Sequence, residues 1–161
     1  MLPAKVIWKP ILQRWITGQG KPFRMRPANP MIASGLERIG LYLHVPFCAS
    51  MCPFCPYNRV PYDETLFERY RRAVCQEIDA CAPSLDGVKI GSLYVGGGTP
   101  TVNRDGLVQI LQHLRDTFTL YCVICVEIHP AHKDDVDMAV LADAGVTLLS
   151  VGVESTNVVL L

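Results

Sequence analysis

The chain has 161 residues, of which 50% are hydrophobic and 19% are charged, and its formal net charge is zero. This balance excludes disordered, fibrous and disulfide-dense secreted proteins, and it indicates one soluble globular unit that can bury a core. Seven cysteines, an odd number, disfavour a complete disulfide framework, so we expect a reducing compartment, the cytoplasm. No apolar span is long enough to cross a bilayer, and we expect no transmembrane segment.

Residues 1–37 are predicted to form a basic N-terminal arm and connector, followed by the main domain at 38–161. Residues 1–36 contain no acid and six basic residues, which are Lys5, Lys9, Arg14, Lys21, Arg24 and Arg26. Within the arm, residues 4–17 (AKVIWKPILQRWIT) place Ile and Trp near helical spacing, a basic amphipathic pattern. Such a helix packs on its own domain or docks on a membrane surface, a partner or a nucleic acid. We favour packing on the domain and expect no nucleic-acid partner.

Strand and helix patterns alternate along the rest of the chain. The apolar run 41–45 (LYLHV) precedes a proline and predicts a buried strand. Helices are then predicted at 63–82, 104–118 and 133–145, and strands at 89–98, 121–129 and 146–155. Asp63 is expected to cap the first helix, and Gly145 to end the third in the left-handed conformation.

The two longer helices carry apolar stripes that define their buried faces. The first stripe consists of Leu66, Tyr70, Val74, Ile78 and Cys81, and the second of Leu107, Ile110, Leu111, Leu114 and Phe118. Strand, helix and strand at this pitch predict right-handed βαβ units and a parallel sheet buried on both faces. The predicted fold class is therefore α/β, with about four βα units.

Chemically distinctive residues follow each predicted strand. Cys48, Cys52 and Cys55 follow the first strand, the sequence GGGTP follows the second, and Glu127 and Glu154 end the third and fourth. Because the carboxyl ends of parallel strands share one edge, these residues are predicted to meet there.

Three cysteines in one loop leave two metal centres to consider. A structural zinc site needs a fourth ligand, which would be His44, Cys122 or Cys125. Cys122 and Cys125 lie within a predicted strand on opposite faces, which favours packing over metal binding. An iron–sulfur cluster held by three thiolates would instead keep one iron open for a ligand that is not protein.

Four ordered motifs resemble the radical S-adenosylmethionine (SAM) enzymes. They are CxxxCxxC from Cys48, GGGTPT from Gly96, EIHP from Glu127 and LSVGVES before Thr156, and the resemblance covers about residues 38–161. It is most specific to the subgroup of oxygen-independent coproporphyrinogen III oxidase and the related haem chaperone. The resemblance implies a partial TIM-like barrel, and since such a barrel needs roughly 200 or more residues, we expect this chain to be the front part of a longer protein. The resemblance implies a 4Fe-4S cluster whose open iron binds SAM, and reductive cleavage of SAM to a 5′-deoxyadenosyl radical. It also implies an electron donor such as flavodoxin or ferredoxin.

The resemblance further assigns roles to individual residues. It makes Cys48, Cys52 and Cys55 the cluster ligands, and it gives no assignable catalytic side chain. The implied SAM contacts are Tyr42 from the first strand, the backbone of Phe54 against the adenine, Gly96, Gly97 and Gly98 beside the methionyl group, the hydroxyl of Thr99, and Glu127 and Glu154 at the amino or ribose groups.

The substrate is not encoded in these residues. The resemblance implies a small-molecule substrate, with a tetrapyrrole as the candidate, and either hydrogen abstraction, as an oxidoreductase, or methyl transfer. Tyr57 stands where the oxidase of this subgroup has a further cysteine, so the subgroup alone does not define the reaction. The alternatives are a haem-trafficking protein that keeps the cluster and a structural zinc module.

Overall fold

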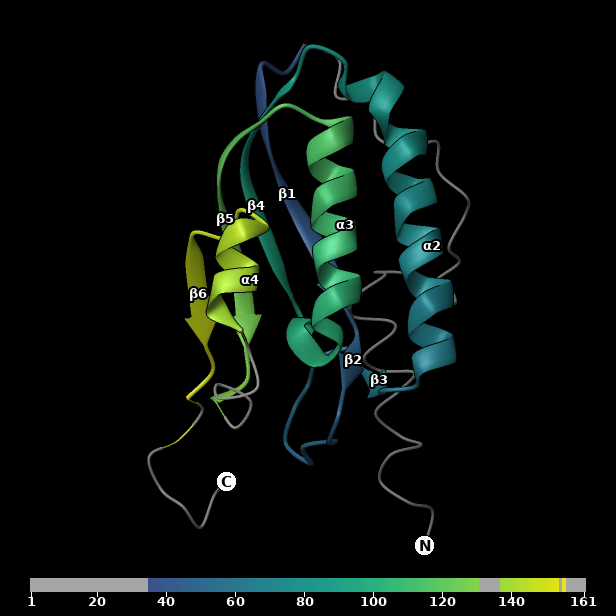
Figure 1. Cartoon of the computed structure of the whole chain (residues 1–161), viewed down its shortest axis with the longest axis vertical. Helices are drawn as coiled ribbons and strands as arrows, with labels where there is room; N and C mark the ends of the chain where they lie inside the picture. The colour runs from purple at the N-terminus through teal and green to yellow at the C-terminus, as the bar shows by residue number, and fades with distance from the viewer. Residues whose placement is uncertain (1–34, 131–136, 154, 156–161) are drawn as a thin grey trace, which may run out of the picture. The chain divides into compact units, whose positions relative to one another are not determined.

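A computed structural model describes residues 35–130, 137–153 and 155 of the chain, all within the unit Ile32–Leu161 (Figure 1). The predicted basic arm and Glu154 lie outside the described residues, so both remain predictions. Among the described residues, no helix is both long enough and apolar enough to cross a bilayer.

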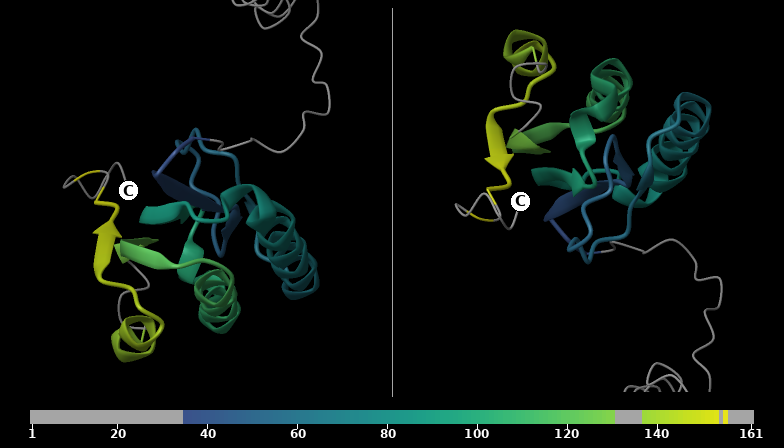
Figure 2. Two further views of the ribbon diagram at one scale, coloured as in Figure 1. Left: turned by 90° about the horizontal axis from the view of Figure 1, so that it is seen from above. Right: turned by 90° about the horizontal axis from the view of Figure 1, so that it is seen from below.

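The described residues form a four-stranded parallel sheet with helices between its strands. The strands are β1 (Arg38–Val45), β4 (Lys89–Gly97), β5 (Leu120–Ile128) and β6 (Leu148–Val151), in that spatial order. The helices are α2 (Glu64–Cys81), α3 (Arg104–Thr117) and α4 (Met138–Asp143), with 3₁₀ turns η1 (Ala82–Leu85) and η2 (Pro100–Asn103). All three α-helices lie on the same side of the curved sheet (Figure 2). This arrangement confirms the predicted α/β class and the partial TIM-like barrel.

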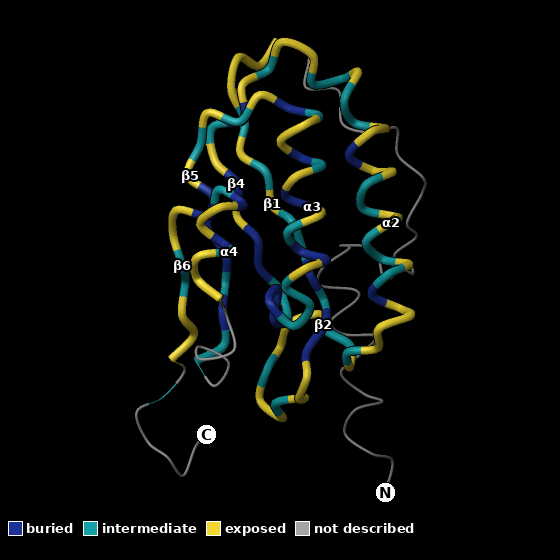
Figure 3. Tube along the Cα trace, in the orientation of Figure 1, coloured by how far each residue is buried: buried dark blue, intermediate teal, exposed yellow. Residues whose placement is uncertain are grey.

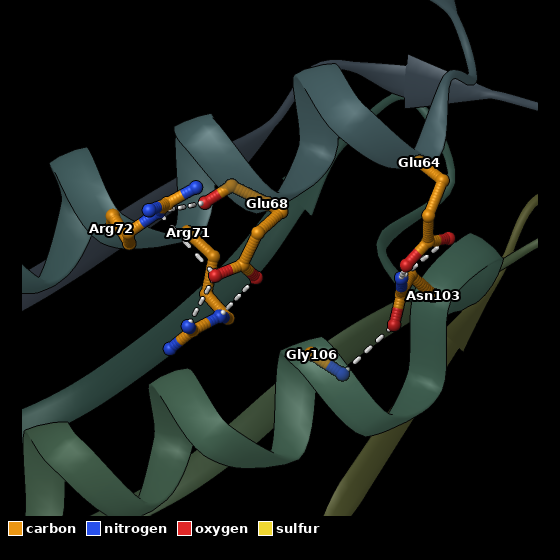
Figure 4. A network of polar contacts seen from close by, with 6 residues as sticks. All are labelled: Glu64, Glu68, Arg71, Arg72, Asn103 and Gly106. Carbon is orange, nitrogen blue, oxygen red and sulfur yellow. Dashed lines mark hydrogen bonds and ion pairs between the residues drawn. The ribbon is translucent and has the colours of Figure 1, made fainter.

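Side-chain caps begin the two long helices where the sequence indicates. The carboxylate of Asp63 accepts a hydrogen bond from Leu66 N at 2.7 Å, as predicted for α2. Asn103 accepts from Gly106 N at 2.8 Å at the start of α3, and its amide also reaches the Glu64 carboxylate at 3.4 Å (Figure 4). The second contact links the beginnings of the two helices. Such caps satisfy backbone N–H groups that the helix itself leaves unpaired.

The core lies between the sheet and its helices. The predicted stripe on α3 is buried, with Leu107, Ile110 and Leu111 fully enclosed. On α2 the prediction was wrong at one position: Leu66 is 40% exposed, whereas the neighbouring Phe67 is 1% exposed. Also on α2, Glu68 forms a partly buried ion pair with Arg71 at 2.7 Å (Figure 4).

The second face of the sheet differs from the prediction that both faces are buried. Alternate residues of the strands point away from the helices, and several are exposed apolar side chains. The exposed fractions are 60% for Tyr42, 54% for Val123 and 53% for Leu148 (Figure 3 shows the exposed positions in yellow). The cause is that α2, α3 and α4 all cover the other face. We call this exposed side the inner face, since it is the face that a closed barrel encloses.

Candidate functional site

A loop carrying the three cysteines follows β1 and is closed at its base by two short strands. The strand β2 (Phe47–Cys48) pairs in parallel with β3 (Val60–Pro61), and residues 49–59 between them project past the carboxyl ends of the main strands (Figure 1). Tyr62 N donates to Cys48 O at 2.9 Å, which holds the base of the loop. We call residues 48–59 the cysteine loop.

The thiols of the cysteine loop differ in burial. Cys48 at the base is buried, whereas Cys52 and Cys55 are half-buried, and all three are free. The side chain of Arg59 folds back along the loop and donates to the carbonyl oxygens of Cys52 and Cys55, and to the Met51 sulfur at 3.3 Å. This arginine, which the sequence did not single out, therefore fixes the backbone that carries two of the thiols.

The segment 96–99 packs directly against the base of the cysteine loop. Thr99 N donates to Phe47 O at 2.7 Å, and the Thr99 hydroxyl lies 3.9 Å from the Cys48 sulfur. A Cβ atom at Gly98 would lie 2.5 Å from Phe47 O and 2.9 Å from that sulfur, so only glycine permits this contact. The cysteine motif and the glycine motif are thus in direct contact, although Gly98 lies 50 positions after Cys48 in the sequence.

Burial raises the pKa of the Cys48 thiol, and the Thr99 hydroxyl and the Arg59 charge partly offset that effect. A thiolate at this position is therefore disfavoured by desolvation in the chain alone, and a cation bound to the sulfur would reverse the balance.

Glu127, at the end of β5, is held by two donors from β4. Its Oε1 accepts from the Tyr94 hydroxyl at 2.6 Å, and its Oε2 accepts from Gly97 N at 3.0 Å. A Cβ atom at Gly96 would lie 2.8 Å from that same Oε2, so the glycine lets the carboxylate approach the strand. Gly97 has a φ of 122°, which favours glycine at this turn.

Tyr42 of β1 and Tyr94 of β4 lie side by side on the inner face. Tyr42 stacks on Tyr94 with ring centroids 6.1 Å apart, and its hydroxyl lies 3.0 Å from Nδ1 of His44. The other ring nitrogen of His44 lies 3.0 Å from Asn58 O. His44 therefore has hydrogen-bond partners for both ring nitrogens. Burial, followed by the Glu127 charge, raises the pKa of Tyr42.

The structure brings most of the residues named from the sequence to one edge of the sheet. Contacts join Cys48, Gly98 and Thr99 on one side and Gly97 and Glu127 on the other. Phe54 lies near the tip of the cysteine loop and is 51% exposed. The role of each residue remains a prediction, and Glu154 lies outside the described residues.

The sequence analysis missed Tyr94 and Arg59. An alternation argument would have found Tyr94, because it pairs in register with Tyr42 and lies two residues before Gly96. No sequence signal indicated Arg59, since its contacts depend on how the cysteine loop folds back.

The donor set fits a cluster held by three thiolates better than a four-ligand zinc site. In the described part of the chain, no three cysteine, histidine or carboxylate side chains are gathered closely enough to hold a metal ion, and this includes Cys48, Cys52 and Cys55, so the comparison between the two centres rests on the number and kind of donors. Two of the three residues considered as a fourth ligand are engaged elsewhere: His44 is hydrogen-bonded at both nitrogens, and Cys122 packs against the core on the helix side. The third, Cys125, is a free, buried thiol in β5. Three free thiols on one loop are the donor chemistry that an iron–sulfur cluster uses.

Comparison with known proteins gives concordant matches. The family model of the radical SAM superfamily matches residues 42–160. The chain is 33% identical over 130 residues to anaerobilin synthase of Escherichia coli O157:H7, covering 78% of this chain and 29% of that protein. It is 35% identical to oxygen-independent coproporphyrinogen III oxidase of Paracoccus denitrificans, covering 72% and 27%, and 32% identical to heme chaperone HemW of Mycobacterium tuberculosis, covering 74% and 32%.

A solved structure is similar as well. Coproporphyrinogen III oxidase (HemN) from Escherichia coli, described as a radical SAM enzyme, matches with a TM-score of 0.70 and 31% identity, covering 76% of this chain and 29% of that one. The chain thus spans about a third or less of the length of the relatives that it matches.

Proposed function

Since the chain belongs to the radical SAM superfamily, we propose that it is the cluster-bearing part of a radical SAM enzyme that binds a 4Fe-4S cluster and SAM. When bound, the cluster supplies the electron for reductive cleavage of SAM to a 5′-deoxyadenosyl radical. One observation carries the proposal: the backbone at Gly98 lies so close to Cys48 that a Cβ there would be 2.9 Å from the sulfur. This close approach of the two family motifs supports a single site.

The residues of the cysteine loop and Thr99 have distinct proposed roles in holding the cluster. Cys48, Cys52 and Cys55 would hold the cluster, and Arg59 keeps the backbone of the last two in place. Thr99 can donate its hydroxyl to the Cys48 sulfur, which stabilises a thiolate there.

The neighbouring strand ends would receive SAM. Gly96 and Gly97 leave the backbone open for close approach, and Glu127 keeps acceptor capacity on both oxygens for an amino or hydroxyl group. Tyr42, Phe54 and Glu154 are proposed as further SAM contacts, on the resemblance stated above.

We propose a tetrapyrrole or a related small molecule as the substrate. Support comes from the relatives, whose names refer to coproporphyrinogen, anaerobilin and heme. Hydrogen abstraction and methyl transfer both remain compatible with the site, and the electron donor would be a flavodoxin or ferredoxin. A second candidate is haem trafficking with retention of the cluster, which the similarity to heme chaperone HemW favours. Free cysteines and an oxygen-sensitive cluster suit the cytoplasm.

The metal assignment is tested by anaerobic reconstitution with iron and sulfide. We expect a brown protein with thiolate-to-iron charge-transfer absorbance, and loss of that absorbance in Cys48→Ala, Cys52→Ala and Cys55→Ala. Cys75→Ala and Cys122→Ala are matched controls that should keep it, because those thiols lie on α2 and on the helix side of β5. A colourless protein with stoichiometric zinc would refute the assignment.

The SAM assignment is tested on the reduced, reconstituted protein. Addition of SAM should change the electron paramagnetic resonance spectrum of the cluster, since a new ligand at one iron alters its ligand field. An unchanged spectrum, together with no SAM binding in equilibrium dialysis, would leave a cluster protein of another kind.

A further inference from the structure

The carboxylate of Glu127 is oriented at both of its oxygens. The Tyr94 hydroxyl donates to Oε1 at 2.6 Å, and the Gly97 amide donates to Oε2 at 3.0 Å. Each carboxylate oxygen can accept more than one hydrogen bond, so both retain capacity for a ligand. Two donors at different oxygens fix the plane of the carboxylate, whereas the amide alone would leave it free to turn about a single contact.

Tyr94 is itself held in place by its neighbours. Its ring stacks on Tyr42 with an interplanar angle of 21°, and the two residues are in register on adjacent strands. A Cβ atom at Gly96 would lie 3.0 Å from Cε1 of the Tyr94 ring and 2.8 Å from Oε2 of Glu127. Because Gly96 has no side chain, the Tyr94 ring and the Glu127 carboxylate can both approach the backbone there and form their hydrogen bond.

We propose that Tyr94 is the positioning residue for Glu127, and that its hydroxyl holds the carboxylate in the orientation that receives the amino or ribose group of SAM. This inference rests on the proposed function and adds a residue to it, since the resemblance assigns Glu127 but not Tyr94. The side chain of Tyr94 is 37% exposed, so water competes with it and its contribution is moderate. Hydrogen bonding to Glu127 raises the pKa of Tyr94 and the Ser150 hydroxyl partly offsets this, and the phenol, whose ordinary pKa of 10.0 already lies well above neutral, is protonated as a donor.

The test measures the dissociation constant of SAM on the reconstituted protein by equilibrium dialysis. Tyr94→Phe removes the hydroxyl and keeps the ring that stacks on Tyr42. We expect affinity to fall about tenfold, as for the loss of one hydrogen bond to a charged group. The SAM-induced change in the resonance spectrum should need correspondingly more SAM, while the cluster content stays that of the unaltered protein.

A double-mutant cycle separates positioning from direct contact. If Tyr94 acts through Glu127, Tyr94→Phe should change affinity by less than about twofold when Glu127→Ala is already present. Tyr121→Phe is the matched control, because it removes a hydroxyl from a 68%-exposed tyrosine at the amino end of β5. It should leave affinity unchanged.

Each other result overturns the inference in a recognisable way. An unchanged affinity in Tyr94→Phe shows that the hydroxyl does not matter, and a full penalty in the Glu127→Ala background shows that it touches SAM directly. Loss of the cluster in Tyr94→Phe assigns the residue a structural role. Failure of the unaltered protein to bind SAM removes the proposed function itself, and with it the inference.

Discussion

At the scale of single residues, the site depends on backbone approaches that any side chain would block. Gly98 is the clearest case, because the two atoms nearest to its would-be Cβ are the Phe47 carbonyl oxygen at 2.5 Å and the Cys48 sulfur at 2.9 Å. A carbonyl oxygen in a paired strand cannot move aside as a flexible side chain can. The glycine motif and the cysteine motif are therefore sterically coupled, and a change in one is transmitted to the other.

This coupling predicts the effect of Gly98→Ala. The added methyl should push the base of the cysteine loop away from β4, and cluster content after reconstitution should fall by more than about half, as expected when a ligand leaves its position. Gly91→Ala, within β4, is the control, since the three atoms nearest to its Cβ would all belong to the flexible Arg38 side chain. The iron and sulfide content of both variants measures how much cluster each one holds. Equal cluster content in the two would contradict the steric coupling of the two motifs.

The hydrogen bond of the Tyr94 phenol predicts the pH range in which this group ionises. Its hydrogen bond to Glu127 raises its pKa above the ordinary value of 10.0. A raised pKa in the folded state means that the stabilisation is fully present below pH 10.0 and is lost as the pH rises through the folded-state pKa. Ultraviolet difference titration of the folded protein against Tyr94→Phe should show this phenol ionising above pH 10.0. Ionisation at or below that pH would show that the hydrogen bond does not persist in solution.

At the scale of helices and strands, the contact between α2 and α3 is decided by Phe67. Its ring is 1% exposed and packs on Gly106 of α3, where a Cβ would collide with the ring. Gly106 lowers the helix propensity of α3, but its lack of a side chain leaves space for the Phe67 ring. The same ring lies 5.2 Å from that of Phe47, next to Cys48, so the helix contact also supports the base of the cysteine loop.

Neighbouring residues on α2 make a matched pair for measuring this contact. Phe67→Ala should lower the free energy of unfolding by about 3–5 kcal/mol, because it leaves a cavity in the core. Leu66→Ala should lower it by less than about 1 kcal/mol, since that side chain is 40% exposed. Denaturant unfolding of the apoprotein gives both values. Similar losses for the two variants would mean that the helix sits in a different rotation from the one described.

Local signals predicted the elements well and their contacts less well. The Asp63 cap, the left-handed Gly145 and the α3 stripe were all correct, because each depends on a few residues close in sequence. The choice between Leu66 and Phe67 could not be made in that way, since both lie near the edge of the apolar stripe and Gly106 on another helix decides it. Tyr94 and Arg59 were missed for the same reason: register and loop folding create their contacts.

At the scale of the whole described unit, the sheet is covered on one face only. The inner face carries Tyr42, Tyr121, Val123 and Leu148, each more than half exposed. Among the described residues, β6 pairs with β5 and presents its other edge without a partner strand. A parallel sheet normally has both faces covered, and an open edge with apolar neighbours is a template for association. The relatives, of which this chain covers about a third or less, have additional chain that could cover this face.

The inner face therefore predicts that the isolated 161-residue chain self-associates. Val123→Lys places a charge on that face, where the native side chain is 54% exposed, so it should shift the chain toward monomer without lowering its melting temperature. Ile124→Lys is the paired control: the adjacent side chain points to the core and is 4% exposed, and burial of its charge should unfold the chain. Analytical ultracentrifugation and thermal unfolding distinguish these outcomes. If the unaltered chain is instead a monomer with a sharp, cooperative transition, its inner face is already protected, and the exposure described for Tyr42 and Val123 does not persist in solution.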